Sequence, residues 1–311
     1  MKIIFMGTPV FAVPSLKNLI DAGYDIPLVV TQPDKKGNRN KVIPSPVKVL
    51  AESLNLNVSQ PERIRKNAEF ISMIESIAPD MIVVAAFGQI LPQELLDIPK
   101  FGCINVHGSL LPELRGAAPM QMAILEGFAE TGVTIMKMEA GLDTGDMISK
   151  VSCNIEGLNI TQVSEMLSIA GANLLVQTIP GIVDGTATYT KQNDEMSTYA
   201  HMINKSDGLT CFDENADVLE RKIRAYYEWP NLYSYLDDLQ VKFFKAEAIM
   251  DNSSNSIPGK ISEVGKDYYI IDCKLGKLKI LEQQLQGKKR MSAADFMRGH
   301  KLSVGDKFEV K

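Results

Sequence analysis

From Gly102 to Pro112 the sequence reads GCINVHGSLLP, and an apolar run over residues 80–86 precedes it. Both segments have the continuous apolar content of strands that are buried on two faces. His107 then falls where the second strand gives way to a loop. Open α/β sheets bind ligands at the carboxyl ends of their strands, so this stretch predicts a parallel sheet with a functional site at its edge.

The rest of the N-terminal half repeats the same alternation of strand and helix signals. The chain opens with a strand over 2–6, the turn Gly7-Thr8-Pro9 and a helical pattern. Apolar runs predict further strands over 28–31, 81–86, 103–107 and 134–138, and helical spacing predicts helices over 46–54, 68–77, 118–125 and 161–179. This order predicts a doubly wound, mainly parallel, Rossmann-like sheet. The opening turn lacks G-x-G-x-x-G, which argues against a nicotinamide enzyme.

The hydrophobic period changes to two beyond residue 241. Short strands are expected over 241–249, 259–264, 268–273, 277–285 and 307–310. Such strands, with turn residues between them, predict a small β-barrel. The OB-fold, which commonly binds oligonucleotides, is the first candidate, and a purely structural barrel has the same signal. We therefore expect an α/β catalytic domain at 1–190, a polar linker at 191–206 and an OB-like barrel domain at 207–311.

Composition places the chain among ordinary globular proteins. It has 311 residues, 45% of them hydrophobic, and a net charge of −5. This charge argues against bulk attraction to nucleic acid, so any RNA contact must come from local basic patches. The four cysteines lack metal-ligand spacing, no apolar run approaches the ~20 residues of a membrane span, and the N-terminus has no signal-peptide layout. We expect a cytoplasmic protein with no metal and no membrane contact.

Three kinds of polar group point to the chemistry. Asn105 and His107 lie two positions apart, so on a strand their side chains point to the same face. Asp143 and Asp146 follow in the glycine-bracketed loop Gly141–Asp146. An amide, an imidazole and a carboxylate are the parts of a general acid–base site that transfers acyl groups. Taken singly, each residue also fits a plainer role as a satisfied polar group or a turn former.

Three motifs resemble the folate-dependent formyltransferases. They are NVHGSLLP at Asn105–Pro112, RGAAP at Arg115–Pro119 and GLDTGD at Gly141–Asp146. GTP at Gly7–Pro9 and SPVKVLA at Ser45–Ala51 are similar to the members that act on methionyl-tRNA, and the resemblance covers essentially the whole chain. It implies transfer of a formyl group from 10-formyltetrahydrofolate to the amino group of initiator methionyl-tRNA. The nucleophile then belongs to the substrate, so the protein needs no serine or cysteine nucleophile.

The resemblance also assigns roles in the site. Asn105 would donate to the oxyanion, His107 would contact the oxyanion or protonate the leaving folate nitrogen, and Asp143 would orient His107. The folate would contact Asp143 and two loops, whose residues are Phe87, Gly88, Gln89, Ile90, Leu91, Ser109, Leu110, Leu111 and Pro112. By its own residues, the loop at 87–91 is a glycine-containing turn beside apolar side chains. That composition suits a flat heteroaromatic ring, and it also fits plain packing.

Basic residues gather in two loops. The first loop has a single acid, Asp34, and four basic residues, which are Lys35, Lys36, Arg39 and Lys41. The resemblance implies that this loop grips the acceptor arm of the tRNA. The second cluster lies between strands of the expected barrel, where it suits contact with phosphates, and consists of Lys288, Lys289 and Arg290. The first loop also fits a solvated flexible loop.

Two residue roles and the substrate have alternatives. Phe11 either lines a pocket for the methionine side chain or packs in the core, and Arg115 either forms a structural salt bridge or contacts the substrate. A formyltransferase for a small amine, such as glycinamide ribonucleotide or an amino sugar nucleotide, would share the same catalytic residues, but the basic loop and the barrel favour tRNA. A non-enzymatic RNA-binding protein would need no such catalytic set. Nothing in the sequence demands a dimer, so we expect a monomer.

Overall fold

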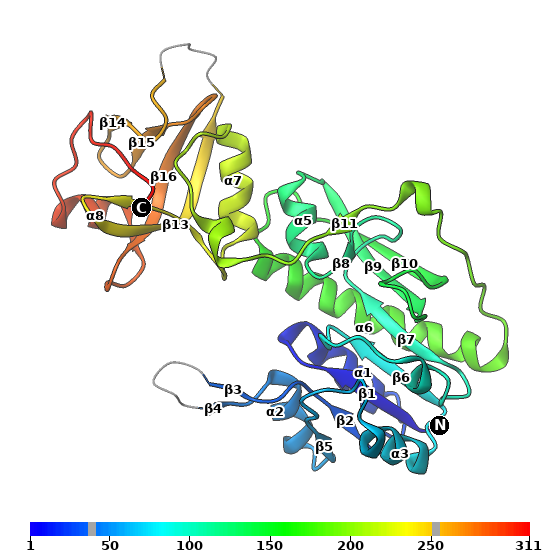
Figure 1. Ribbon diagram of the computed structural model, residues 1–311. Coiled ribbons are helices and arrows are strands. Elements are labelled where there is room, and N and C mark those ends of the chain that lie inside the picture. The colour runs from blue at the N-terminus through cyan, green and yellow to red at the C-terminus, as the bar shows by residue number, and fades with distance from the viewer. Residues whose placement is uncertain (37–41, 251–255) are drawn as a thin grey trace. The chain divides into compact units, whose positions relative to one another are not determined.

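The computed structural model of the chain describes residues 1–36, 42–250 and 256–311 (Figure 1). Two of the basic residues singled out above, Arg39 and Lys41, lie outside these ranges. Contacts between residues divide the chain into two compact units. The first unit comprises Met1–Pro119, Glu130–Asn154 and Ser164–His201, and the second comprises Met120–Ala129, Ile155–Val163 and Met202–Lys311. The domain limits expected from the sequence stay a prediction.

Within the described residues, a seven-stranded sheet forms the centre of the first unit, in the order β10-β9-β7-β6-β1-β2-β5. Its strands are β1 (Ile3–Gly7), β2 (Val29–Val30), β5 (Val58–Ser59), β6 (Met81–Ala85), β7 (Cys103–His107), β9 (Glu130–Lys137) and β10 (Met147–Asn154). The strands from β5 to β7 are parallel, and β9 and β10 are antiparallel. Every residue of β1, β6 and β7 is buried, as their apolar sequences require. The predicted doubly wound, mainly parallel sheet is confirmed.

The helices of this unit follow the strands, and all but the short α4 lie where helical patterns were expected. They are η1 (Val10–Ala12), α1 (Val13–Asp21), α2 (Pro46–Ser53), α3 (Ala68–Ile77), α4 (Gln93–Leu96) and most of α6 (Ile160–Asp184). The Ser45 Oγ accepts a hydrogen bond from the Lys48 amide at 3.2 Å and so caps α2. The Asn67 side chain caps α3 in the same way, at 3.0 Å from the Phe70 amide. The predicted helices at 46–54 and 68–77 are therefore confirmed.

The long helix α6 packs against the sheet at a glycine. A Cβ on Gly171 would lie 3.0 Å from methyl carbons of Val106 and Val133, so the helix approaches β7 and β9 closely there. In the part of the chain that the structure describes, α6 is the one helix whose length and apolar composition would allow it to cross a membrane. A core helix of a globular protein can have the same length and composition. The buried residues of α6 recur on one face, as in a core helix, and include Leu167, Ala172, Leu175 and Ile179.

The second unit is built on an antiparallel sheet in the order β12-β13-β16-β15-β14, with β17 paired to β16. Its strands are β12 (Leu232–Leu236), β13 (Leu239–Ile249), β14 (Ile261–Val264), β15 (Tyr269–Asp272), β16 (Lys277–Leu285) and β17 (Met291–Ser292), and its helices include α5 (Pro119–Leu125), α7 (Ala216–Ala225) and α8 (Ala293–Gly299). The rings of Phe212, Phe243 and Phe308 meet in its core, 5.5–5.7 Å apart. Aromatic edge-to-face contacts of this kind stabilise a small core beyond the area that they bury.

The C-terminal residues close this sheet toward a barrel. Lys307 pairs with Lys260, beside the edge strand β14, and Glu309 pairs with Tyr235 on the opposite edge strand β12. The two edges are therefore joined by one short segment. The continuous strand predicted at 307–310 is wrong, because its residues make isolated bridges to two different neighbours.

Residues 192–200 belong to the stretch that the sequence predicts as a linker, and they pack on the first unit. β11 (Tyr199–Ala200) pairs in parallel with β8 (Arg115–Gly116). Gly116 has a φ of +116°, and a Cβ there would lie 2.7 Å from the Ala200 carbonyl oxygen. Glycine is therefore required at this contact, which sets the segment beside the RGAAP motif.

Candidate functional site

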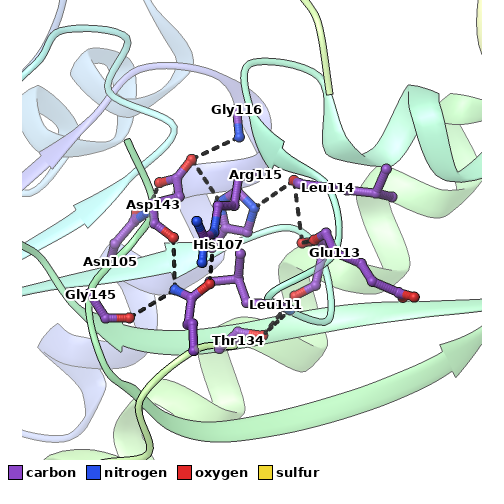
Figure 2. Close-up of polar contacts among 12 residues, drawn as sticks. Asn105, His107, Leu111, Glu113, Leu114, Arg115, Gly116, Thr134, Asp143 and Gly145 are labelled. Atoms are coloured by element: carbon purple, nitrogen blue, oxygen red, sulfur yellow. Dashed lines mark hydrogen bonds and ion pairs between the residues drawn. The ribbon is translucent and has the colours of Figure 1, made fainter. Parts of the chain in front are cut away.

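Three polar side chains meet near the carboxyl end of β7 (Figure 2). The Asp143 Oδ2 atom lies 3.7 Å from His107 Nδ1, and Asp143 Oδ1 lies 3.5 Å from Asn105 Nδ2. His107 and Asn105 are buried, with 5% and 9% of their surfaces exposed. The structure therefore brings together the three residues to which the sequence assigned the chemistry. The two-residue spacing on β7 places the amide and the imidazole on one face, as expected.

Asp143 reaches this point by a route that the sequence did not show. β9 runs antiparallel to β7 with Lys137 opposite Ile104, so the loop after β9 starts near the amino end of β7. The loop then returns to Asp143, whose backbone is left-handed with a φ of +53°. The Gly116 amide donates a hydrogen bond to Asp143 Oδ2 at 2.9 Å. A backbone donor thus fixes the carboxylate beside the imidazole (Figure 2).

The carbonyl of Leu114 fixes the tautomer of His107. Its oxygen lies 3.1 Å from His107 Nε2, and because a carbonyl can only accept, we assign a proton to Nε2 from this partner. The other ring nitrogen, Nδ1, faces Asp143. Leu114 itself has a left-handed backbone, with a φ of +58°. This conformation is costly for a leucine and needs support from its surroundings.

Side chains on β9 and β10 hold the loop that follows β7. The Thr134 Oγ1 donates to the Ser109 carbonyl at 2.8 Å and accepts from the Leu111 amide at 3.1 Å. Lys150 on β10 donates to the Leu111 carbonyl, and burial lowers the pKa of this lysine. The side chains of Ser109 and Leu111 are buried, whereas Leu110 and Pro112, which follows a cis peptide bond, are half-buried. Ser109 and Leu111 therefore shape the loop rather than present side chains outward.

The loop after β6 offers backbone and one apolar side chain to a ligand. Phe87 and Leu91 are buried, and the Gln89 side chain is held by the Ile64 amide, from which its Oε1 accepts at 2.9 Å. Gly88 is exposed, with a φ of +85°, and Ile90 has 68% of its surface exposed. The turn thus combines accessible peptide groups with an outward isoleucine, which is the combination that a flat heteroaromatic ring requires.

A cavity of about 530 Å³ opens beside α4, near the amino end of β7. It lies between α4, which follows the loop after β6 directly, and the first residues of the loop that leads to Asp143. Its lining includes Leu96, Lys100, Lys137, Met138 and Glu139. Its size falls in the range of ligand pockets, roughly 300–1,000 Å³. The cavity is lined by residues near the amino end of β7, and its lining includes none of the residues at 87–91 or 109–112.

Arg115 takes the structural role of the two that the sequence left open. Its side chain is buried, with 2% exposed, and its guanidinium donates to Gln192 Oε1 at 2.9 Å and to Asp194 Oδ1 at 2.8 Å. Gln192 in turn donates to the carbonyls of Asp143 and Gly145, at 2.7 and 2.8 Å. Sequence reasoning missed Gln192, because it lies in a polar stretch with the composition of a linker and far from its partners along the chain.

The basic hairpin is anchored by its one acid. Lys35 and Lys36 form β3, which pairs with β4 (Val42–Ile43). The Asp34 carboxylate accepts from Lys48 Nζ at 2.6 Å and from Gln60 Nε2 at 2.7 Å. The hydrogen bond from Lys48, followed by that from Gln60, lowers the pKa of Asp34 below its usual range. Lys48 belongs to the SPVKVLA motif, so this motif holds the base of the hairpin.

The remaining predicted contacts are scattered. Phe11 is buried in η1, so it packs in the core. Lys288 and Lys289 are exposed in the turn before β17. The Arg290 guanidinium is paired with Glu282 and lies over the rings of Tyr227 and Phe244, 4.8 and 4.6 Å from their centroids. Among the described residues, no cluster of three or more His, Cys, Asp or Glu side chains could hold a metal ion.

Family models match most of the chain. The model described as formyl transferase matches residues 1–179, and the model described as formyl transferase, C-terminal domain, matches residues 202–301. The methionyl-tRNA formyltransferase of Citrifermentans bemidjiense is 46% identical over 307 residues, which are 98% of this chain and 95% of that protein. The enzyme of the same name from Bacillus licheniformis is 47% identical over 309 residues, 98% of this chain and 97% of its own.

Solved structures share the fold at low sequence identity. A sugar 3N-formyl transferase, WlaRD, has a TM-score of 0.66 at 21% identity and covers 93% of this chain and 99% of its own. The N-formyltransferase from Helicobacter canadensis, solved with folinic acid and dTDP-3-aminofucose, has a TM-score of 0.65 at 19% identity and covers 90% and 98%. HypX from Aquifex aeolicus, in complex with tetrahydrofolic acid, has a TM-score of 0.66 at 13% identity and covers 100% and 51%.

Proposed function

Because the chain belongs to the formyl transferase family, and within it to the methionyl-tRNA formyltransferases, we propose that it transfers the formyl group of 10-formyltetrahydrofolate to the free amino group of initiator methionyl-tRNA. The product is N-formylmethionyl-tRNA, which serves translation initiation. The observation that carries the proposal is the meeting of an amide, an imidazole and a carboxylate near the end of β7. All three groups come from one chain, which supports action as a monomer. Translation also makes the cytoplasm the expected compartment.

The chemistry assigns one task to each of the three groups. The substrate amine attacks the formyl carbon, a carbon–nitrogen bond forms, and negative charge develops on the formyl oxygen. The Asn105 amide donates to that oxygen, because its contact with Asp143 is long at 3.5 Å and leaves the N–H available. His107 takes the proton of the amine at Nδ1 and gives a proton to the folate nitrogen, which leaves as its bond to the formyl carbon breaks. Asp143 then stabilises the imidazolium at 3.7 Å.

The folate substrate is proposed to lie between the loop after β6 and the loop that carries Asp143. Support comes from the exposed peptide groups around Gly88 and from the exposed side chains of Ile90 and Leu142, one from each loop. Ser109 and Leu111 contribute by holding the shape of their loop, and Leu110 and Pro112 retain partial exposure.

The tRNA is proposed to contact the basic hairpin and the second unit. Lys35 and Lys36 lie on β3, and Lys288 and Lys289 are exposed in a turn of the barrel-like sheet. The guanidinium of Arg290 forms an ion pair with Glu282, so we assign it to holding the turn and not to binding phosphate. These clusters supply local positive charge on a chain whose net charge is −5.

A formylation assay separates the proposed function from its rivals. With 10-formyltetrahydrofolate as donor, we expect rapid formylation of charged initiator methionyl-tRNA and none of the uncharged tRNA. Glycinamide ribonucleotide and an amino sugar nucleotide serve as competing acceptors in the same reaction. Preference for either small amine would contradict the tRNA assignment. Failure to bind tetrahydrofolate in a calorimetric titration would instead favour an RNA-binding protein without enzymatic activity.

Asp34→Asn should weaken tRNA recognition without harming the chemistry. The change removes the ion pair with Lys48, so the hairpin loses its anchor. We expect the KM for methionyl-tRNA to rise about 3- to 10-fold, the scale of one ordinary hydrogen bond, with kcat near that of the unchanged protein. Because the pKa of Asp34 is lowered, its carboxylate is ionised at neutral pH, and the anchor is lost only as the pH falls through that lowered value.

The matched control for this change is Asp21→Asn. Asp21 pairs with Lys17 one turn away on the exposed face of α1, so its loss should leave both kinetic constants unchanged. A fall in kcat for Asp34→Asn at an unchanged KM would contradict the assignment of the hairpin to tRNA binding.

A further inference from the structure

The segment 192–200 contacts the backbone of the Asp143 loop and of Leu114, whose carbonyl bonds to His107. Its first residue, Gln192, bonds to the buried guanidinium of Arg115, and its last two residues form β11, which pairs with β8. Two of its side chains, Gln192 and Thr198, make hydrogen bonds to loops of the catalytic site. Each of these bonds joins residues more than 45 positions apart in the chain, since Gln192 is 49 residues from Asp143 and Thr198 is 84 from Leu114.

Gln192 holds the loop of Asp143. Its Nε2 donates to the carbonyl oxygens of Asp143 and Gly145, and its Oε1 accepts from Arg115 Nε. The orientation of the amide is fixed by chemistry, because the two carbonyls need a donor and the guanidinium needs an acceptor. The Asp143 backbone is left-handed, and a Cβ on Gly145 would lie 1.9 Å from the Lys137 carbonyl oxygen. This turn is tight, and the side-chain amide of Gln192 donates hydrogen bonds to two of its backbone carbonyls.

Thr198 holds the residue that orients His107. Its Oγ1 accepts from the Leu114 amide at 2.9 Å, and its carbonyl accepts from the Arg115 amide at 2.9 Å. The Leu114 carbonyl is the acceptor for His107 Nε2. Leu114 therefore has both of its peptide groups occupied, one by the segment and one by the imidazole. A shift of this left-handed residue would move the acceptor that sets the tautomer and the direction of His107.

We propose that Gln192 and Thr198 form a positioning clamp for formyl transfer, in which Gln192 sets the Asp143 loop and Thr198 sets His107 through Leu114. This inference rests on the proposed function. Neither residue contacts the reacting atoms, so both are positioning residues. Residues that orient a catalytic group from behind typically change activity about 10- to 100-fold, and a misplacement of about 1 Å can cost 10²-fold.

Gln192→Glu is the decisive variant. The carboxylate is nearly isosteric and pairs with Arg115, so the fold and the buried guanidinium keep their partner. It places an oxygen where two carbonyls need a donor, so the Asp143 loop must move. We expect kcat to fall about 10- to 100-fold, with the KM values for folate and tRNA changed less than about threefold. A purely structural tie to Arg115 would instead leave kcat unchanged.

The control for the added charge is Asn193→Asp on the same segment. The Asn193 side chain accepts from the Glu195 amide at 3.1 Å, and a carboxylate can accept the same bond. Its kcat should match that of the unchanged protein. If Asn193→Asp loses as much kcat as Gln192→Glu, the loss comes from charge alone and the clamp is overturned.

The second arm uses Thr198. Thr198→Val keeps the shape and removes the acceptor for the Leu114 amide, and Thr198→Ser keeps the acceptor. We expect kcat to fall several-fold in the valine variant and to be restored in the serine variant, with thermal unfolding unchanged in both. Full activity of both Gln192→Glu and Thr198→Val, in a preparation whose unchanged protein formylates methionyl-tRNA, overturns the clamp and leaves the proposed function intact. An inactive unchanged protein overturns the proposed function.

Discussion

His107→Ala should lower kcat for methionyl-tRNA formylation by about 10²- to 10⁴-fold, the usual contribution of an aligned acid–base group. The imidazole is buried, its Nε2 is held by the Leu114 carbonyl, and its Nδ1 faces the Asp143 carboxylate at 3.7 Å. Alanine removes the atom that exchanges protons and leaves the backbone of β7 in place. Initial rates at saturating folate and tRNA measure the loss.

Two controls make this result specific. His201 is exposed and belongs to the same unit, so His201→Ala should keep full turnover. Tetrahydrofolate affinity, measured by calorimetry, should remain within a few-fold in His107→Ala, which shows that the fold and the folate loops survive. Near-normal turnover in a folded His107→Ala protein would remove His107 from the chemistry.

The central part of this site was predictable because it depends on local geometry. Asn105 and His107 share a face by the two-residue period of a strand, and burial of β7 follows from its apolar run. Asp143 was predictable as a loop carboxylate, but its path was not, because it depends on the antiparallel return of β9 beside β7. Strand order is set by tertiary packing, which no single segment of sequence records.

The positioning clamp was not predictable, for a related reason. Gln192 donates to backbone carbonyls, and every type of residue has a backbone carbonyl. The sequence therefore does not show which residues accept these hydrogen bonds. β11 is two residues long and carries no detectable period. A polar composition therefore predicted a linker over 191–206, although residues 192–200 pack on the first unit. The requirement for glycine at Gly116, beside Ala200, is the one local trace of this contact that the sequence holds.

The second unit shows where period-two patterns predict strands and where they fail. β13 and β16 carry clear alternation and were predicted closely, at 241–249 and 277–285. The strand expected at 307–310 is instead a pair of single bridges, because its residues face two strands at opposite edges of the sheet. Alternation reports which side chains are buried, and it does not report whether one partner strand runs alongside.

Asn105→Ala should lower kcat and kcat/KM together by about 10²- to 10³-fold, because the amide is expected to act on charge that develops only in the transition state. Its contact with Asp143 is long, at 3.5 Å, so the resting enzyme does not commit the N–H. Asn105→Asp is the sharper comparison. The side chain keeps its size and loses its donor, and it sets a second carboxylate where the oxyanion forms. If Asn105 only fills space, the aspartate variant should be nearly active; if it donates, the aspartate should be at least as damaging as alanine.

The double variant tests whether Asn105 and His107 act as one unit. Independent contributions multiply, so the combined loss would be the product of the two single losses. Groups that serve one transition state are strongly non-additive, and removing the second costs little once the first has gone. We expect Asn105→Ala combined with His107→Ala to be only slightly slower than the worse single variant. Asn18→Ala, which removes an exposed amide that bonds to Asn173 and not to a residue of the site, should combine with His107→Ala without further loss. Fully multiplicative losses for Asn105 and His107 would mean that the two side chains serve separate steps, and formyl transfer at a shared centre would have to be abandoned.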